Sequence, residues 1–284
     1  MSVFHKAIDR YRSGGALHLV NEICRFLFDR LESIAPSPLK KVVLTVYWLP
    51  YFYILARSET GYKLSKINSS KEFHFPQLRH HRRFRQKGLN RKRDLYYGFG
   101  EVSIEPGDRV VDIGAFIGEA SISIADIASE IYPVEPSPRS YACLEKNAQN
   151  VECITPVNCG AWNESGEMDF NLGTDATDDS ILEPDHGGDG SVETVSVDTI
   201  ENICLDLGVA SVDFMKVEAE GVEPEVLKGL GDLRPTKIAV NCDPERQGKS
   251  TEEEVTHLLS DMGYETYSGG GEYYTIVYAK FADE

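Results

Sequence analysis

The chain has 284 residues, of which 41% are hydrophobic and 26% charged, and its formal net charge is −17. This length and hydrophobic content allow a full α/β core with an additional segment. The six cysteines form no C-x-x-C pair and no metal-ligand spacing, so we expect reduced thiols and no metal site. The first residues lack an apolar core followed by a cleavage site, which excludes a signal peptide there and favours a cytoplasmic protein.

The charge is distributed unevenly along the chain. Residues 1–100 carry 19 Lys/Arg against 7 Asp/Glu (+12), and the remaining 184 carry 10 against 39 (−29). This asymmetry predicts a basic N-terminal extension over residues 1–95 and an acidic catalytic domain over residues 96–284. An excess of surface carboxylate is typical of proteins in a high-salt cytoplasm, so we also expect a halophilic source.

The extension begins with an amphipathic pattern. Apolar residues at helical spacing predict a helix over residues 16–35 that ends before Pro36. An uncharged, aromatic-rich segment follows at residues 42–56, and with Pro50 in the middle it is too short for a membrane span. Two interpretations stay open: a buried helix or strand pair that packs on the main domain, or an interfacial membrane segment.

Residues 79–93 carry eight Arg or Lys. Such a run is commonly a solvated face, but here it stands out against an acidic protein. It predicts a surface that binds phosphate on a lipid carrier, an acidic sugar or a nucleic acid, or that lies on an anionic membrane. Phe84 is the one aromatic residue within the run, which does not favour nucleic acid. We therefore expect peripheral contact with the inner face of the membrane through residues 40–93.

From Ile104 onward, short strands and helices alternate. This pattern predicts a mostly parallel central sheet with helices on both faces. The expected strands are 109–113, 130–134, 153–158, 192–197, 212–217, 237–241, 264–268 and 273–279. The expected helices are 119–128, 138–147 capped by Ser137, a helix capped by Asp198 that runs to residue 207, 224–230 and 251–262. Residues 173–191 combine six acids with four glycines and predict a loop or lid.

The stretch 110–119 reads as a strand, an acidic residue, a Gly-x-x-x-Gly turn and a helix. In dinucleotide-binding folds the turn is G-x-G-x-x-G, and the important acid lies about 20 residues later. Here Asp112 precedes the turn, where a carboxylate would repel a pyrophosphate and suit a cationic sulfonium and its amino group. Glu135, 23 positions later at the end of the next strand, can accept both hydroxyls of a ribose. The pair favours S-adenosylmethionine over NAD.

The predicted cofactor-binding residues follow the first three strands of this domain. They are Asp112, Gly114, Ala115, Phe116, Gly118, Glu135, Pro136, Asn158, Gly160 and Ala161.

A second cluster of charged residues, Lys216 to Glu223, lies at the carboxyl end of a later strand. Sheets of this kind bind ligands beyond those ends, and closely spaced ionisable groups perturb one another's pKa. We predict Glu218 or Glu220 as the general base for methyl transfer to oxygen, and Lys216 as the residue that orients the acceptor or a carboxylate. Ser180 and Glu223 are predicted acceptor contacts. The alternative is that the acids cap the following helix and the lysine pairs with them.

These motifs resemble the FkbM family of methyltransferases. The resemblance rests on D-I-G-A-F-I-G at 112–118, the segment from Glu135-Pro-Ser-Pro to Asn147, Ser196-Val-Asp198, and K-V-E-A-E-G-V-E at 216–223 followed by V-L-K-G. It covers about residues 100–280 and implies a class I, Rossmann-like methyltransferase fold with S-adenosylmethionine as the cofactor. Two positions differ from the family pattern: Glu218 replaces the usual Asp, and Phe116 replaces a small polar residue.

The resemblance implies methylation on the oxygen of a sugar or natural-product acceptor. We therefore expect an S-adenosylmethionine-dependent O-methyltransferase that acts on a sugar, a glycan or a lipid-linked saccharide. Two other hypotheses stay open: a nucleic-acid methyltransferase that uses the basic run, and a non-catalytic cofactor-binding scaffold at the membrane.

Overall fold

The computed structural model describes residues 53–66, 71–84, 86–182, 188–271 and 274–282. The chain divides into two compact units, Met1–Leu78 and Arg79–Glu284. The predicted helix over residues 16–35 and residues 42–52 of the aromatic segment lie outside the described residues. Among the described residues, no helix is both long enough and apolar enough to cross a membrane.

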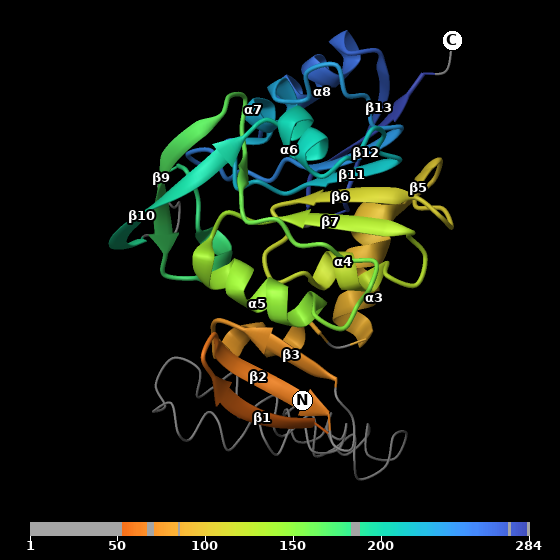
Figure 1. Cartoon of the computed structure of the whole chain (residues 1–284). Helices are drawn as coiled ribbons and strands as arrows, with labels where there is room; N and C mark the ends of the chain where they lie inside the picture. Colours follow the sequence, from red (N-terminus) through yellow and green to blue (C-terminus); the bar gives the residue numbers. More distant parts are fainter. Residues whose placement is uncertain (1–52, 67–70, 85, 183–187, 272–273, 283–284) are drawn as a thin grey trace, which may run out of the picture. The chain divides into compact units, whose positions relative to one another are not determined.

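The described part of the first unit is a three-stranded antiparallel sheet. Its strands are β1 (Tyr53–Ser58), β2 (Gly61–Lys66) and β3 (Glu72–Phe75), in the order β1-β2-β3 (orange in Figure 1). Leu64 and Phe75 are fully buried in this unit. The end of the aromatic segment, residues 53–56, therefore lies in a strand, one of the kinds of structure that the sequence analysis left open.

The second unit begins at Arg79, so it includes the basic run that the sequence placed in the extension. The run forms η2 (Leu78–Arg82) and most of α3 (Gln86–Tyr97), and β4 (Gly98–Phe99) and β5 (Val102–Ser103) follow. Tyr96 and Tyr97 at the end of α3 are fully buried, and the Tyr97 ring lies 5.0 Å from that of Phe214 in the central sheet. The helix thus packs into the core of the catalytic unit.

Six strands form the central sheet: β6 (Arg109–Ile113), β7 (Glu130–Val134), β11 (Phe214–Val217), β12 (Lys237–Asn241), β13 (Tyr264–Gly269) and β14 (Ile276–Phe281). Their order is β13-β14-β12-β11-β6-β7, with β14 antiparallel to both of its neighbours and the other pairs parallel. Parallel bridges from Ile154 and Val157 extend the pairing of β7 to the predicted third strand. The mostly parallel α/β sheet is therefore confirmed.

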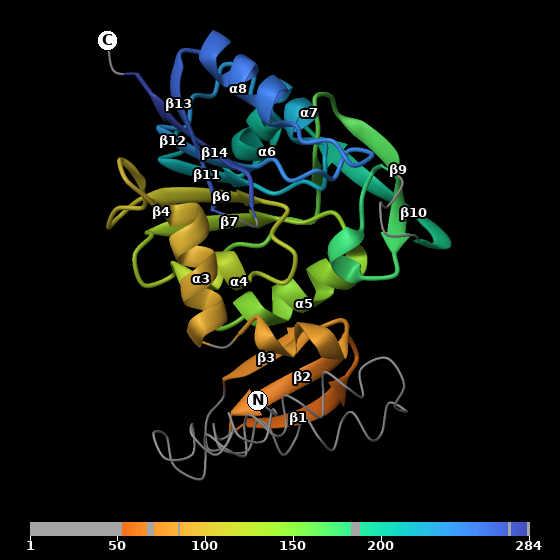
Figure 2. The same ribbon diagram turned by 180° about the vertical axis from the view of Figure 1, so that it is seen from behind.

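Helices cover both faces of this sheet (Figures 1 and 2). The helices after α3 are α4 (Glu119–Ser123), α5 (Pro138–Ala148), α6 (Ile200–Asp206), α7 (Glu223–Lys228) and α8 (Glu252–Asp261). Alternate strand residues face opposite sides: Val111 packs in the cluster that includes residues of α6, α7 and α8, whereas Val110 packs with residues of α3 and α4. Burial on both faces explains why these strands are almost continuously apolar.

A smaller sheet of order β8-β10-β9 lies beside the main one, formed by β8 (Gly160–Ala161), β9 (Gly166–Gly173) and β10 (Gly188–Asp198). The sequence pattern did not predict β9, in which only Phe170 and Gly173 are buried. The predicted acidic loop is shorter than expected because β10 already begins at Gly188, and η3 (Ala176–Asp178) lies within it.

Two predicted helix ends were wrong. The first helix of the domain ends at Ser123 rather than at residue 128, and the Ser123 hydroxyl donates to Ala120 O at 2.6 Å, a local bond that competes with the helical ladder. Thr199, not Asp198, caps α6, because its Oγ1 accepts from Asn202 N at 3.1 Å. Asp198 instead accepts from the side chains of Ser165 and Asn202.

Candidate active site

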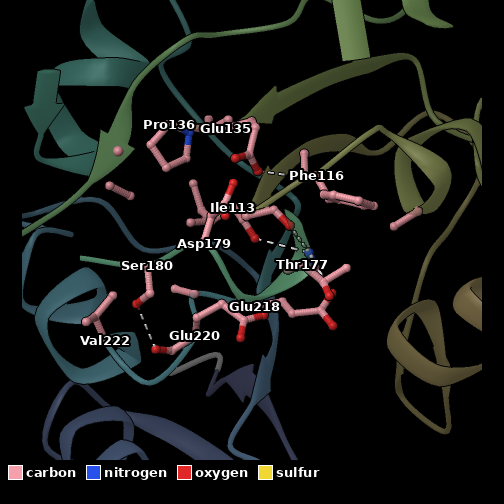
Figure 3. Close-up of a pocket in the computed structure, with 18 of the residues that line it drawn as sticks. Ile113, Phe116, Glu135, Pro136, Thr177, Asp179, Ser180, Glu218, Glu220 and Val222 are labelled. Atoms are coloured by element: carbon pink, nitrogen blue, oxygen red, sulfur yellow. Dashed lines mark hydrogen bonds and ion pairs between the residues drawn. The ribbon is translucent and has the colours of Figure 1, made fainter. Parts of the chain in front are cut away.

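A cavity opens at the carboxyl ends of β6, β7 and β11 and contains about 1030 Å³ of atom-free space, its open mouth included (Figure 3). We name two groups of lining residues. The motif side consists of Ile113, Gly114, Ala115, Phe116, Glu135, Pro136, Gly160 and Ala161. The charged side consists of Arg83, Lys92, Glu119, Lys216, Glu218 and Glu220.

The turn after β6 is fixed by main-chain contacts. The N–H groups of Gly114 and Ala115 donate to Val134 O at 3.0 and 3.1 Å. Gly114 has φ +67°, and a Cβ there would lie 1.7 Å from the carbonyl oxygen of Glu218. Glycine is therefore required because the turn passes directly over the main chain that follows β11.

Gly118 serves packing rather than the cavity. Its φ is +85°, and a Cβ there would lie 2.7 Å from the Leu144 side chain in α5. It is not among the residues that line the cavity. Of the predicted cofactor residues, Gly118 thus lets the turn and α5 approach each other, whereas Gly114 shapes the wall.

Glu135 is the buried acid of the motif side. Its Oε2 accepts from Phe116 N at 2.8 Å and its Oε1 from Ser137 N at 2.9 Å, and Figure 3 shows the bond to Phe116. Burial raises the pKa of Glu135 to about 8. Each carboxylate oxygen can accept a further hydrogen bond. This arrangement fits the two neighbouring hydroxyls of a ribose, as an S-adenosylmethionine site requires.

The remaining predicted cofactor residues have two positions: some line the cavity, and one supports its wall from outside. Pro136, Gly160 and Ala161 line the cavity. Asn158 does not, and its Nδ2 donates to Glu135 O at 2.9 Å. The side chain of Asn158 therefore fastens the main chain at the end of β7.

Asp112 lies beneath the turn rather than in the cavity wall. It is fully buried, accepts from Ser121 Oγ at 2.6 Å and lies 3.0 Å from Lys216 Nζ. The sequence analysis placed its charge opposite the sulfonium and amino group of the cofactor. In the structure Lys216 is its charged partner and Asp112 does not line the cavity, so a direct contact with the cofactor stays a prediction.

Lys216 joins the two sides of the cavity. Its Nζ donates to Ile113 O and Gly114 O at 3.1 and 2.8 Å, and it also lies 3.2 Å from Glu218 Oε2. Burial alone would lower the pKa of Lys216, but Asp112 and Glu218 outweigh it and raise the pKa. The lysine is therefore a buried cation that positions carboxylates.

Glu218 is held by a second lysine. Lys92 Nζ, from α3, lies 3.0–3.1 Å from its two carboxylate oxygens, and both lysines lie over the Tyr96 ring, 5.1–5.4 Å from its centre. Burial would raise the pKa of Glu218, but Lys92 and Lys216 together hold it well below the ordinary value. A carboxylate with such a low pKa is a weak base.

Glu220 has the opposite electrostatic environment. Burial and the neighbouring Glu245 raise its pKa well above the ordinary value, and the same kind of environment raises the pKa of Glu245 to about 9. Glu220 has φ +52°, which is uncommon outside glycine. Ser180 Oγ donates to Glu220 O at 3.3 Å, a bond drawn in Figure 3.

Ser180 lines the cavity next to an anchored acid. Asp179 accepts from Ser137 Oγ at 2.7 Å, from Arg139 Nε at 2.8 Å and from Gly173 N at 2.9 Å. These bonds tie the segment after η3 to the start of α5. Ser137 does occupy the N-cap position of that helix, but its hydroxyl bonds Asp179 instead of capping.

Glu223 lies below the wall. It is fully buried, and its Oε1 accepts from Gly221 N and Ala219 N at 3.0 and 3.2 Å, whereas its Oε2 accepts from Thr251 Oγ1 at 3.0 Å. The side chain shapes the turn before α7 and does not line the cavity. Its predicted contact with the acceptor stays a prediction, and α7 has no side-chain cap at its first turn.

The basic run contributes residues that the sequence analysis did not assign to the site. Arg83 pairs with Glu119 and Lys92 with Glu218, and all four line the cavity. Outside the cavity, Arg79 pairs with Asp175 and Arg93 with Asp126. The sequence analysis predicted a binding surface here and not these pairs; the opposite charges of the run and the acidic domain were the available signal, but they do not identify the partners. Among the described residues, no group of His, Cys, Asp and Glu is arranged to hold a metal ion.

The sequence matches the family model of the methyltransferase FkbM domain over residues 112–266, more than half of the chain. The chain belongs to the FkbM methyltransferase family. S-adenosylmethionine is accordingly the expected cofactor, and the family agrees with the class I, Rossmann-like sheet described above.

Three of the solved structures to which this chain is similar are as follows. FkbM from Methylobacillus flagellatus is 19% identical with a TM-score of 0.47; the match covers 66% of this chain and 47% of that one. Fibrillarin from Aeropyrum pernix, with S-adenosyl-L-methionine bound, is 15% identical with a TM-score of 0.43, covering 80% and 98%. Precorrin-6y C5,15-methyltransferase from Geobacter metallireducens is 15% identical with a TM-score of 0.43, covering 69% and 90%.

The chain thus spans less than half the length of the Methylobacillus protein. A search of curated proteins gave no significant match.

Proposed function

We propose that the chain transfers a methyl group from S-adenosylmethionine to a hydroxyl of a sugar, a glycan or a lipid-linked saccharide. The observation that carries this proposal is the charged side of the cavity, which presents cations and carboxylates next to the predicted cofactor residues. A polyhydroxyl acceptor donates and accepts hydrogen bonds at every position, so it can use both kinds of group. Hydrogen bonds to charged groups are also about twice as strong as neutral ones.

Glu220 is the proposed general base. Bound S-adenosylmethionine supplies an electrophilic methyl group, and the acceptor hydroxyl loses a proton as it attacks in line. The raised pKa of Glu220 makes it the stronger base of the two predicted carboxylates. Glu218 stays ionised between Lys92 and Lys216, where it can accept hydrogen bonds from other hydroxyls of the acceptor. Lys216 acts through Glu218 as a positioning residue.

Kinetics with radiolabelled S-adenosylmethionine and a panel of saccharide acceptors test this assignment. We expect Glu220→Gln to lower kcat by about 100-fold or more, the usual contribution of a general base. Glu218→Gln should mainly raise KM for the acceptor. The exposed Glu167 in β9 supplies a matched control, Glu167→Gln, which should leave both constants unchanged. Wild-type kcat in Glu220→Gln would contradict the proposed base.

The same panel tests the two other hypotheses. A non-catalytic scaffold predicts no transfer to any acceptor and biological activity that survives both Glu→Gln changes. A nucleic-acid methyltransferase predicts binding to RNA or DNA that weakens steeply with salt. The structure gives that hypothesis little support, because Arg79, Arg83, Lys92 and Arg93 pair with acids of their own unit.

A lipid-linked acceptor would place the protein at the inner face of the membrane. Residues 40–52 of the proposed membrane-contacting segment lie outside the described residues, so this part of the proposal rests on their aromatic and basic composition. Flotation of the full chain with anionic and neutral vesicles tests it. Binding to the anionic vesicles is expected, and absence of the protein from both floated fractions would overturn the membrane contact.

A further inference from the structure

Glu119, the first residue of α4, has an unused hydrogen-bonding atom. Its side chain lines the cavity and is 2% exposed, and its Oε1 lies 2.5 Å from Arg83 Nη1. Among the described residues, its Oε2 is buried and has no hydrogen-bond partner. Leaving a charged acceptor buried and unsatisfied is costly, so such an atom in a cavity wall indicates a ligand with a donor.

Arg83 supplies the opposite charge at the same place. Its guanidinium carries five N–H donors, and the bond to Glu119 leaves others for a carboxylate, which arginine commonly binds through two parallel bonds. Burial would lower the pKa of Arg83, but Glu119 and Glu218 outweigh it and raise the pKa. The group therefore stays a cation within the wall.

Phe116 connects this ion pair to the motif side. Its N–H donates to Glu135 Oε2, and the guanidinium of Arg83 lies over its ring at 4.9 Å from the centre. The His80 ring contacts the same phenyl ring edge to face, at 5.0 Å between centres. Phe116 therefore has a structural use here: its main chain holds the ribose-binding acid and its ring supports the cation.

We propose that Arg83 and Glu119 bind the α-carboxylate and the α-ammonium of the methionyl end of S-adenosylmethionine. A zwitterion requires one cation and one anion side by side, and this pair offers both at the cavity wall. In the cofactor, the sulfur joins the ribose to the amino-acid end. In the cavity, Phe116 contacts both groups of residues: its N–H donates to Glu135, and its ring lies under the guanidinium of Arg83. The proposal rests on S-adenosylmethionine as the cofactor and is independent of the acceptor.

The binding of two nucleosides distinguishes a contact with the amino-acid end of the cofactor from a contact with its adenosine or with the acceptor. S-adenosylhomocysteine and 5′-methylthioadenosine share adenosine and a thioether, but the second lacks the amino-acid end. Isothermal titration of the full chain with each compound should show that Arg83→Gln and Glu119→Gln weaken binding of S-adenosylhomocysteine by about 10- to 100-fold, the usual effect of a charge-assisted hydrogen bond. Binding of 5′-methylthioadenosine should change by less than about twofold, because it makes no contact with the pair.

The Arg93–Asp126 ion pair is a matched control. It joins α3 to the turn after α4, at 3.5 Å, but neither residue lines the cavity. Arg93→Gln and Asp126→Asn should leave the affinities for both nucleosides unchanged. Arg83→Lys adds a milder variant that keeps the charge and loses the planar fork, so it should weaken S-adenosylhomocysteine less than Arg83→Gln does.

Three results would overturn the proposal. Equal weakening of both nucleosides would mean that the pair supports the shape of the cavity. Unchanged affinity for S-adenosylhomocysteine together with a raised KM for the acceptor would assign the pair to the acceptor. If the wild-type chain binds neither nucleoside, the assignment of S-adenosylmethionine as the cofactor fails. In contrast, normal cofactor binding without transfer to any saccharide would refute the proposed function and leave the Arg83–Glu119 site intact.

Discussion

The motif side of the cavity is held mainly by main-chain hydrogen bonds, whereas the charged side is held by ion pairs between distant residues. On the motif side, the turn after β6 and the end of β7 bond each other through Val134 O and the Glu135 carboxylate. On the charged side, Lys92 pairs with Glu218, which lies 126 positions later in the sequence. The difference predicts that the charged side responds to salt more strongly than the motif side does.

Removal of Lys216 should have the largest effect, because its cation serves both sides. Lys216→Met leaves the fully buried Asp112 without its cationic partner and leaves Glu218 with Lys92 alone. Breaking a buried pair from one end typically costs about 3–5 kcal/mol in the free energy of unfolding. Urea unfolding measures this loss. The exposed pair of Lys228 and Glu254 supplies the control, and Lys228→Met should cost less than about 1 kcal/mol. Equal losses in the two variants would contradict the assignment.

A methyl group on Gly114 should disrupt the motif side without changing any charge. Gly114→Ala combines a positive φ with a Cβ that would meet Glu218 O. We expect a loss of about 2–4 kcal/mol in the free energy of unfolding and weaker binding of S-adenosylhomocysteine. At Gly166 in β9 an added Cβ would have no atom within 4 Å, so Gly166→Ala should be neutral or slightly stabilising. A stable, cofactor-binding Gly114→Ala protein would show that the close approach is not required.

Replacement of Glu245 should change how the free energy of unfolding depends on pH. Burial raises the pKa of Glu245 from 4.5 to about 9, so the folded state holds a proton that the unfolded state releases earlier. The stability from this group is therefore fully present below about pH 4.5 and is lost as the pH rises toward 9. Glu245→Gln should escape that loss and gain about 1–2 kcal/mol over the wild type between pH 5 and 9. Unfolding at a series of pH values measures the gain, and a constant difference between variant and wild type would refute the raised pKa.

The smallest effect is expected at the outer edge of the basic run. Arg79 is 46% exposed on its side chain, and its partner Asp175 also bonds His80 Nε2 at 2.8 Å and Thr177 N at 3.2 Å. Arg79→Gln should cost less than about 1 kcal/mol, and the difference should vanish in about 1 M salt. Thermal unfolding at low and high salt tests this. A loss as large as that of Lys216→Met would mean that the run is held as tightly at its edge as at the cavity.

Much of the motif side could be predicted because its residues are close in sequence. Strand, acid and glycine turn at 110–118, followed by Glu135 at the next strand end, form one local supersecondary unit, and the structure brings Gly114, Phe116 and Glu135 to one wall. The roles of individual residues were harder to predict. Asp112 and Glu223 were expected in the site, but each lies beneath its turn, where Asp112 pairs with Lys216 and Glu223 accepts from Thr251.

The sequence by itself determined the class of the sheet, the order of most of its strands and helices, and the family. Those features follow from apolar periodicity and short motifs, which act over a few neighbouring residues. Only the tertiary structure decided what the basic run does. Its cations pair with acids 33 to 126 positions away in the sequence, because a charge pairs with whichever acid the fold brings near, and the sequence around the cation does not indicate that acid. The basic run, which the sequence analysis predicted to be a binding surface, contributes Arg83 and Lys92 to the wall of the cavity.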